Sequence, residues 1–127
     1  MGITYTKVKV RNLITKSEPT EIDAKIDTGA AMLVLPSDVA ALHQFPLSRR
    51  ISVKYADESR AERDVVWGVE LEICGRKAVF EAIIEPKKSY ALVGAIVMET
   101  LDVIVELCSL GVYPNPRSPD VPLTEIE

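Results

Sequence analysis

Alternation of apolar and polar residues with a period of two is the main pattern along this chain. In an extended strand this period places apolar side chains on one face and polar ones on the other, so it predicts half-buried β-strands. Residues 31–35 are instead an unbroken apolar run, which is typical of a strand buried on both faces. The strands predicted in this way are residues 3–10, 21–26, 31–35, 50–55, 64–73, 77–85, 90–94 and 102–107.

Short helices are predicted at two places between these strands. Pro36 ends the apolar run, and Ser37 or Asp38 is a suitable cap for a helix over residues 39–43. The second predicted helix is residues 95–101. The expected fold class is therefore all-β (mainly β), with one or two short helices.

A turn at Gly75-Arg76 is predicted to join the strands over residues 64–73 and 77–85 into a hairpin. Strict alternation places Trp67 on the same face as the valine, leucine and isoleucine residues of its strand. We therefore expect Trp67 to pack within the hairpin.

The chain of 127 residues has the length of one domain and contains no evident linker or internal repeat. We expect residues 1–113 to form that domain. Residues 114–127 contain four prolines and form a proline-rich C-terminal tail. Proline excludes a regular helix or a central strand, so the tail is either a loose end or an arm that wraps an edge.

Composition and charge exclude some classes of partner. Apolar residues make up 47% of the chain and charged residues 27%, which allows a buried core and a soluble surface. The net charge is −4 and the basic residues are scattered, so we expect no nucleic-acid partner. No segment approaches the length of a membrane-spanning helix, and residues 1–10 lack the apolar stretch of a signal peptide. We expect no membrane partner and a cytoplasmic protein.

The single histidine, His43, and the two cysteines, Cys74 and Cys108, remove several chemistries. A serine or cysteine triad needs a histidine base, and most catalytic zinc sites need two or more histidines. Two cysteines are too few for a disulfide framework or a thiolate zinc site. We expect no metal and no cofactor, with His43 at the surface or near the helix C-terminus and the cysteines as small apolar residues in strands.

The segment that carries chemistry is Asp27-Thr28-Gly29-Ala30, between a predicted strand and the apolar run over residues 31–35. A carboxylate between buried strands is costly unless it is hydrogen-bonded or shares a proton. Gly29 permits a tight turn and lets backbone N–H groups approach that carboxylate. Asp27 is therefore the candidate functional residue.

This segment resembles the active-site loop of retropepsin-like (retroviral-type) aspartic peptidases. The resemblance implies that Asp27 is the catalytic carboxylate, that Thr28 lies near a dimer axis and hydrogen-bonds across it, and that Gly29 and Ala30 complete the loop. Three residues depart from the family's pattern: Ala31 and Met32 replace acidic residues, and Ala95 replaces an arginine.

Later segments extend the resemblance over about residues 21–107. Leu92-Val93-Gly94 matches the apolar pair and glycine that precede the family's late helix, and these residues are expected to support the site. The family also has a hairpin, the flap, over its substrate; here Tyr55, Ala56, Asp57 and Ser59 fall at the flap position. Residue patterns alone leave Tyr55 equally compatible with a core position, and they favour a solvated turn for Asp57 and Ser59.

The single Asp-Thr-Gly sequence bears on whether the chain pairs with a second copy of itself. Aspartic-peptidase chemistry needs two carboxylates that share one proton, and this chain has one Asp-Thr-Gly sequence. The resemblance therefore implies a single-lobe, retropepsin-like acid-protease barrel that forms a two-fold homodimer and hydrolyses peptide or unfolded protein substrates. The alternative is a non-catalytic module of the same fold, used for dimerisation or peptide binding.

Overall fold

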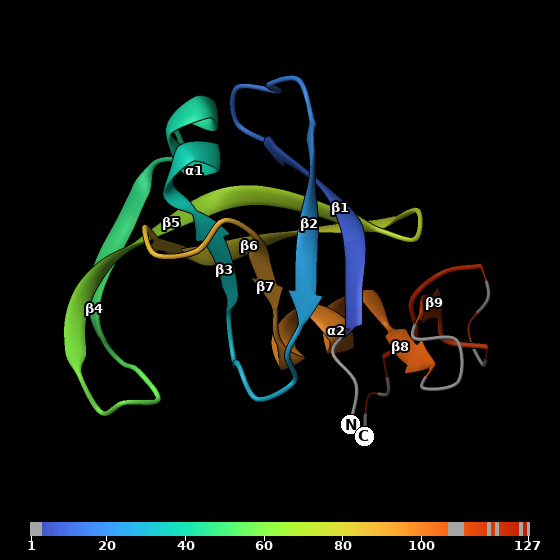
Figure 1. Ribbon diagram of the computed structural model, residues 1–127. Coiled ribbons are helices and arrows are strands. Elements are labelled where there is room, and N and C mark those ends of the chain that lie inside the picture. The colour runs from blue at the N-terminus through green and yellow to red at the C-terminus, as the bar shows by residue number, and fades with distance from the viewer. Residues whose placement is uncertain (1–3, 107–110, 117, 119, 125, 127) are drawn as a thin grey trace.

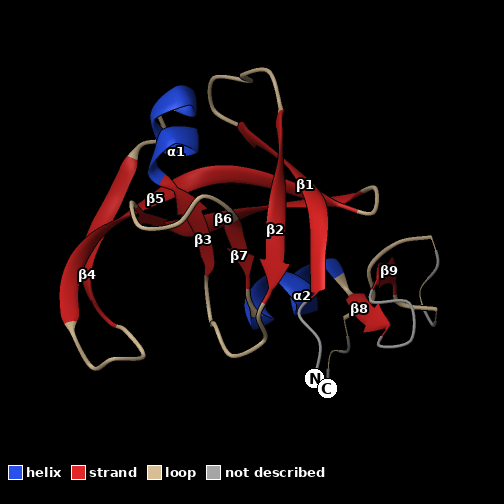
Figure 2. Ribbon diagram, in the orientation of Figure 1, coloured by secondary structure: helices blue, strands red, loops and turns tan. Residues whose placement is uncertain are grey.

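The computed structural model describes residues 4–106, 111–116, 118, 120–124 and 126. The described part is built mainly from strands, with two short helices (Figures 1 and 2). The elements are β1 Thr4–Asn12, β2 Thr20–Ile26, β3 Leu33–Pro36, α1 Ser37–His43, β4 Leu47–Lys54, β5 Arg60–Ile73, β6 Arg76–Glu85, β7 Ala91–Val93, α2 Ala95–Leu101, β8 Val103–Glu106 and β9 Gly111–Pro114. The predicted mainly-β class is confirmed.

Six of the strands close into a barrel. They are hydrogen-bonded in the order β1-β2-β7-β3-β6-β5, and β5 also pairs with β1 through registers such as Val10 opposite Leu71. Strand β4 continues the sheet outside this closure by pairing with β5. Closure leaves few free edges, and edges are where sheets otherwise associate with other chains.

The barrel interior is filled by aliphatic side chains from nearly every strand. Leu33, Leu35, Leu71 and Ile73 are at most 1% exposed. Burial of each such side chain contributes about 1.5–3 kcal/mol. Helix α2 covers one end of this core, and its Leu101 is fully buried.

Strand β7 lies between β2 and β3, parallel to the first and antiparallel to the second. The chain leaves β2 at Ile26, passes the end of β7, and returns as β3. This connection, residues 27–32, is therefore held against the residues that follow β7, although the two segments are far apart in the sequence.

Strand β5 departs from the predicted alternation. A bulge between Val66 and Val69 inserts an extra residue opposite β6, and Gly68 there has φ +74°. An extra residue reverses the side-chain phase, so Trp67 is 46% exposed instead of packed within the hairpin. The prediction for Trp67 was wrong for this reason.

The hairpin of β5 and β6 is confirmed, but its turn is Cys74-Gly75, one residue earlier than predicted, with Ile73 opposite Arg76. Cys74 and Gly75 have φ 55° and 79°, as a two-residue turn of this hand requires. Cys74 is thus exposed in a turn and not in a strand as predicted. Cys108 lies outside the described residues.

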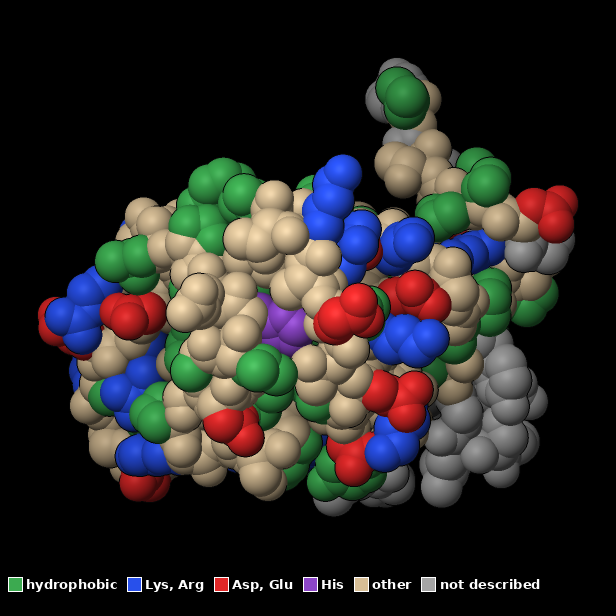
Figure 3. All heavy atoms as spheres, turned by 90° about the horizontal axis from the view of Figure 1, so that it is seen from above, with side chains coloured by type: hydrophobic (Ala, Val, Ile, Leu, Met, Phe, Trp, Pro, Cys, Tyr) green, Lys and Arg blue, Asp and Glu red, His purple; other side chains and the backbone are tan. Residues whose placement is uncertain are grey.

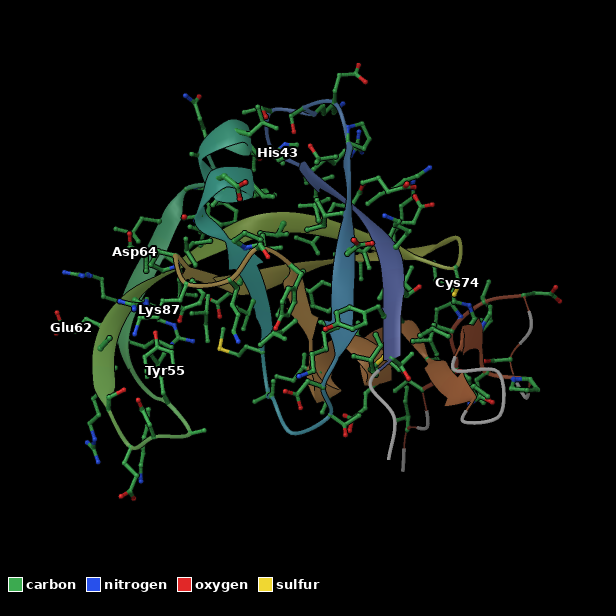
Figure 4. All side chains as sticks on the ribbon, in the orientation of Figure 1. His43, Tyr55, Glu62, Asp64, Cys74 and Lys87 are labelled. Atoms are coloured by element: carbon green, nitrogen blue, oxygen red, sulfur yellow. The ribbon has the colours of Figure 1, made fainter. Side chains whose placement is uncertain are left out.

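His43 is buried, contrary to the expectation of a surface position. It is 4% exposed and stacks on Phe45. Its Nδ1 lies 2.7 Å from Ser17 Oγ and its Nε2 lies 2.8 Å from Thr20 Oγ1. Figure 4 shows His43 between α1 and the loop that joins β1 to β2. The short helix does not expose its last residue, because the preceding loop folds over it.

The end of the chain differs from the predicted final core strand over residues 102–107. Within the described residues β8 pairs with β9 in a separate two-stranded sheet and not with the barrel; residue 107 is not among them. Helix α1 also differs, because it begins at Ser37 and has no side-chain cap bond.

The described part of the tail forms an arm that is attached by polar contacts. Asp102 accepts hydrogen bonds from Asn115 Nδ2 at 2.9 Å, from Ser118 Oγ, and from the Leu123 N–H at 3.0 Å. The Ser118, Asn115 and Leu123 contacts lower the pKa of Asp102 to about 2. The buried Arg76 side chain donates to the carbonyl oxygens of Asp102 and Ser118. The division into a domain of residues 1–113 and a tail of residues 114–127 stays a prediction.

Candidate active site

The Asp27 carboxylate stands at the end of β2, in a turn whose backbone holds it in place. The Asp27 N–H donates to Val93 O at 2.9 Å, which fixes the turn to β7. The Gly29 N–H donates to Asp27 Oδ1 at 3.0 Å, and the Ala30 N–H donates to Asp27 O at 3.0 Å. A Cβ on Gly29 would lie 3.2 Å from Asp27 Oδ1, so the glycine allows this close approach.

Gly94 supports the turn from below. A Cβ at this position would lie 2.2 Å from Ala30 O and 2.8 Å from Ala30 C, so only glycine fits without displacing the loop. The first N–H groups of α2 donate to the same loop, from Ala95 to Ala30 O at 2.9 Å and from Ile96 to Ala31 O at 3.3 Å. The loop thus satisfies N–H groups that a helix start leaves without partners.

The structure therefore brings together the two segments that the sequence singled out, residues 27–30 and 92–94. Asp27 is half-buried in the single chain, less than the sequence suggested, and Thr28, Gly29 and Ala31 are exposed. The catalytic role of Asp27 and the supporting roles of its neighbours stay predictions.

A cleft of about 510 Å³ lies beside Asp27. Its wall is mostly aliphatic, from residues on β3, β4, β6 and β7: Val34, Val53, Ile83 and Leu92. An apolar hollow with a few polar groups is the usual form of a ligand site.

The hairpin of β4 and β5 reaches this cleft with the first residues of its tip. The turn is closed by the Tyr55 N–H, which donates to Ser59 O at 2.9 Å, and by the Glu58 N–H, which donates to Tyr55 O at 2.9 Å. Tyr55 and Ala56 line the cleft. Figure 1 shows this tip and the connection from β2 to β3 at the same end of the molecule, opposite α1.

The two polar residues of the predicted flap tip do not line the cleft. The Asp57 carboxylate accepts bonds from Ser59 Oγ at 2.6 Å and from the Ser59 N–H at 3.0 Å. These two bonds from Ser59 lower the pKa of Asp57. Their described contacts are thus those of a solvated turn.

Sequence reasoning missed a polar cluster around Tyr55. The Tyr55 hydroxyl donates to Glu85 Oε2. Arg63 Nε lies 3.3 Å from Glu85 Oε1, and the Lys87 N–H donates to that oxygen at 3.1 Å. Lys87 Nζ also lies 4.6 Å from the centre of the Tyr55 ring, and Figure 4 shows the two side chains next to each other.

Glu85 is 5% exposed, so its charge needs these partners. Burial alone would raise its pKa, but the bonds from Tyr55 and the Lys87 N–H and the charge of Arg63 outweigh burial and lower it. Burial, followed by the bond to Glu85, raises the pKa of Tyr55. Strict alternation along β6 places Glu85 on the same face as the exposed Val79 and Glu81, so the sequence pattern did not indicate that Glu85 is buried.

Other kinds of site find no support in the described part of the chain. There, no group of three or more His, Cys, Asp or Glu side chains could hold a metal ion. No helix of that part is long and apolar enough to cross a membrane. On the face seen in Figure 3, acidic and basic side chains lie next to one another.

Comparison with known proteins places the fold. No protein-family model matches the sequence, and no curated protein sequence is significantly similar to it. The structure is similar to the solution structure of simian foamy virus (mac) protease, with TM-score 0.54 and 19% identity over 74% of this chain and 90% of that chain. It is also similar to EIAV protease in complex with the inhibitor HBY-793, with TM-score 0.61 and 17% identity over 81% of this chain and 91% of that chain.

A third similar structure is a foamy viral protease–reverse transcriptase in complex with an RNA/DNA hybrid. Its TM-score is 0.57 and its identity 20%, over 76% of this chain and 11% of that much longer one. At these identities the similarity shows the fold alone. The chain has the retropepsin-like barrel of retroviral proteases, which confirms the predicted fold.

Proposed function

We propose that this protein is an aspartic endopeptidase, active as a homodimer in which each subunit contributes Asp27. One observation carries the proposal. In a barrel with the fold of retroviral proteases, Asp27-Thr28-Gly29 places its carboxylate beside an apolar cleft that the tip of the β4–β5 hairpin also lines.

The exposure of the Asp27 loop supports the dimer. Thr28, Gly29 and Ala31 lie uncovered beside the half-buried carboxylate. A two-fold axis beside this loop would bring a second copy of the same surface against it, and with it the second carboxylate. Thr28 would then lie near the axis.

The proposed mechanism follows from two carboxylates that share one proton. Two carboxyl groups about 3 Å apart do not both ionise, because their like charges repel, so the pair titrates as a unit. The ionised carboxylate takes a proton from a water molecule that attacks the peptide carbonyl carbon. The protonated carboxyl donates its proton to the carbonyl oxygen, which gives a tetrahedral intermediate. The carboxyl that took the water's proton then gives it to the amine nitrogen, and the other carboxylate takes back the hydroxyl proton. The C–N bond breaks, leaving a carboxylic acid, an amine and a dyad that again holds one proton. No metal or cofactor takes part in these steps.

The substrate in this proposal is an extended peptide or an unfolded protein. An extended chain lies in a groove by adding its backbone hydrogen bonds to those of neighbouring strands. The proposal keeps a cytoplasmic location, with neither nucleic acid nor membrane as a partner.

A second candidate is a non-catalytic module of the same fold that dimerises or binds peptides. It is favoured by the apolar residues Ala31, Met32 and Ala95 around the loop, where the resembling family has charged ones. Under this alternative the dimer and the cleft persist, and peptide turnover is absent.

Mixing of subunits tests the shared site. Wild-type protein is mixed with a twofold to tenfold excess of Asp27→Asn protein, and cleavage of unfolded casein is measured after subunit exchange. If each dimer needs two Asp27 carboxylates, activity falls toward zero as the variant sequesters wild-type subunits; in an equal mixture about a quarter of dimers stay wild type. The control is Asp23→Asn, an exposed aspartate paired with Lys7 at 2.7 Å. Activity that follows the wild-type concentration alone would contradict the shared dyad.

A further inference from the structure

Four charged residues line the cleft: Asp27, Lys54, Glu85 and Lys88. Asp27 is the proposed catalytic group. The charge that the cleft presents to a ligand then depends on Lys54, Glu85 and Lys88, and on whether each is already neutralised by an ion pair within the chain.

Glu85 contributes little negative charge to the cleft. Its carboxylate is held by the Arg63 guanidinium, the Tyr55 hydroxyl and the Lys87 N–H. A buried carboxylate with this set of partners is compensated within the chain.

The two lysines lack comparable partners. Lys54 Nζ lies 3.6 Å from Glu58 Oε1, and both side chains are more than half exposed, so this pair is weak. Lys88 Nζ lies 5.6 Å from the centre of the Tyr90 ring. Across the described residues, no carboxylate lies within ion-pair distance of Lys88.

The two lysines line the cleft from different elements. Lys54 is the last residue of β4, at the base of the hairpin tip, and Lys88 belongs to the loop between β6 and β7. Aliphatic residues line the same cleft, among them Val34, Ile83 and Leu92.

We propose that this cleft selects peptides that carry an acidic side chain close to a large apolar one, with Lys54 and Lys88 binding the substrate carboxylate. The inference rests on the proposed function, because it assumes that the cleft beside Asp27 holds the peptide. The inference adds to the proposed function the class of peptide that is bound, which is acidic and apolar and not basic.

The expected effect is moderate and depends on charge. Lys54 is exposed and Lys88 half-buried, so an ion pair at each lysine should change affinity by about 1.5- to 5-fold, and salt screens it. A glutamate side chain titrates near ~4.3, so the preference for glutamate over glutamine should fade as the pH drops below that value. A preference based on shape would not change with pH or salt.

The test uses matched sets of peptides with a Leu-Phe centre and Glu, Gln or Lys at each flanking position in turn. For the wild type we expect kcat/KM about 2- to 10-fold higher with Glu than with Gln at one position, and lowest with Lys. Lys88→Gln should reduce the preference for Glu to the part that Lys54 contributes, the double variant Lys54→Gln, Lys88→Gln should abolish it, and the double variant Lys54→Glu, Lys88→Glu should reverse it. Lys77→Glu is the control, because Lys77 is exposed near the other end of β6 and does not line this cleft.

A binding measurement separates failure of this inference from failure of the proposed function. The same peptides, labelled with fluorescein, are titrated with Asp27→Asn protein and followed by anisotropy. Cleavage with no preference for Glu overturns the inference and leaves the peptidase standing. Tighter binding of Glu peptides without any cleavage supports the acidic ligand and favours the non-catalytic alternative. Equal binding of Glu, Gln and Lys peptides, or no binding, overturns the inference.

Discussion

The hydroxyl of Tyr55 donates a hydrogen bond to the buried carboxylate of Glu85, and this bond joins the tip of the β4–β5 hairpin to the end of β6. Arg63, from the other strand of the hairpin, binds the same carboxylate. Both arms of the hairpin are therefore attached to one residue of the barrel wall. Tyr55 lies at the hairpin tip, lines the cleft and is not among the buried core residues, and its contact with a substrate stays a prediction.

Removal of the Tyr55 hydroxyl should loosen the hairpin tip. Tyr55→Phe leaves the buried Glu85 without one of its donors, which costs about 1–3 kcal/mol in the free energy of unfolding. Hydrogen exchange should become faster at residues 56–59, which we expect already to exchange faster than residues 26–29 in the wild type. Tyr5→Phe is the control, because Tyr5 is half exposed and lies on β1. Unchanged exchange at the tip in Tyr55→Phe would argue against the attachment.

Glu85 should make stability depend on acidic pH. Its pKa is lowered in the folded chain relative to the ordinary value of 4.5, so its stabilising contribution is present above 4.5 and is lost as the pH falls through the folded pKa. Glu85→Gln keeps a polar group and removes this titration. In urea unfolding from pH 3 to 7, the variant should be less stable than the wild type at pH 7, and the difference should narrow toward pH 3. A constant difference would mean that the charge of Glu85 is irrelevant to the fold.

His43 should titrate below its ordinary pKa of 6.5, because burial disfavours the charged imidazole. The folded state then binds fewer protons than the unfolded state, so the contribution of His43 to stability is full above 6.5 and decreases as the pH falls toward the folded pKa. His43 is the only histidine in the chain, so its imidazole signals in NMR are unambiguous. The pH at the midpoint of their chemical-shift titration should lie below 6.5. A midpoint at or above 6.5 would contradict the buried, neutral ring between Ser17 and Thr20.

Gly94→Ala should damage the Asp27 loop specifically. The new Cβ would meet Ala30 O at 2.2 Å, which forces the loop to move and costs about 1–3 kcal/mol. Amide chemical shifts of residues 27–31 should change, and any peptidase activity should fall. In Gly75→Ala the added Cβ meets no atom within 4 Å, and its cost is backbone strain at φ +79°. If both variants leave residues 27–31 unchanged, the support from Gly94 is not needed.

The period of two predicted the strands of a mainly-β domain, and the barrel was predicted from the resemblance of Asp27-Thr28-Gly29-Ala30 to the active-site loop of retroviral-type peptidases. The strict alternation missed the bulge at Gly68, which exposes Trp67, although a glycine inside a strand pattern often marks a bulge. His43 is buried against Ser17 of the loop between β1 and β2 and against Thr20 at the start of β2, and a local sequence pattern does not reveal these contacts.

The sequence also predicted part of the candidate site. Asp27 was singled out by the Asp-Thr-Gly motif, and Gly94 by the apolar pair that precedes it. The strand order β2, β7, β3 brings the two residues together. Glu85 could not be found, because strict alternation places it on the exposed phase of its strand, and its partners Tyr55 and Arg63 belong to the β4–β5 hairpin.

The pH dependence of peptide cleavage by wild type and Asp27→Asn tests the central claim most directly. A dyad is active only while it holds one proton, so kcat/KM measured from pH 3 to 8 should be bell-shaped with an optimum below neutral. Asp27→Asn should lower it by about 100- to 10,000-fold at the optimum, with the dimer retained in sedimentation. Activity that survives Asp27→Asn, or that requires an added metal ion, would contradict the aspartic mechanism.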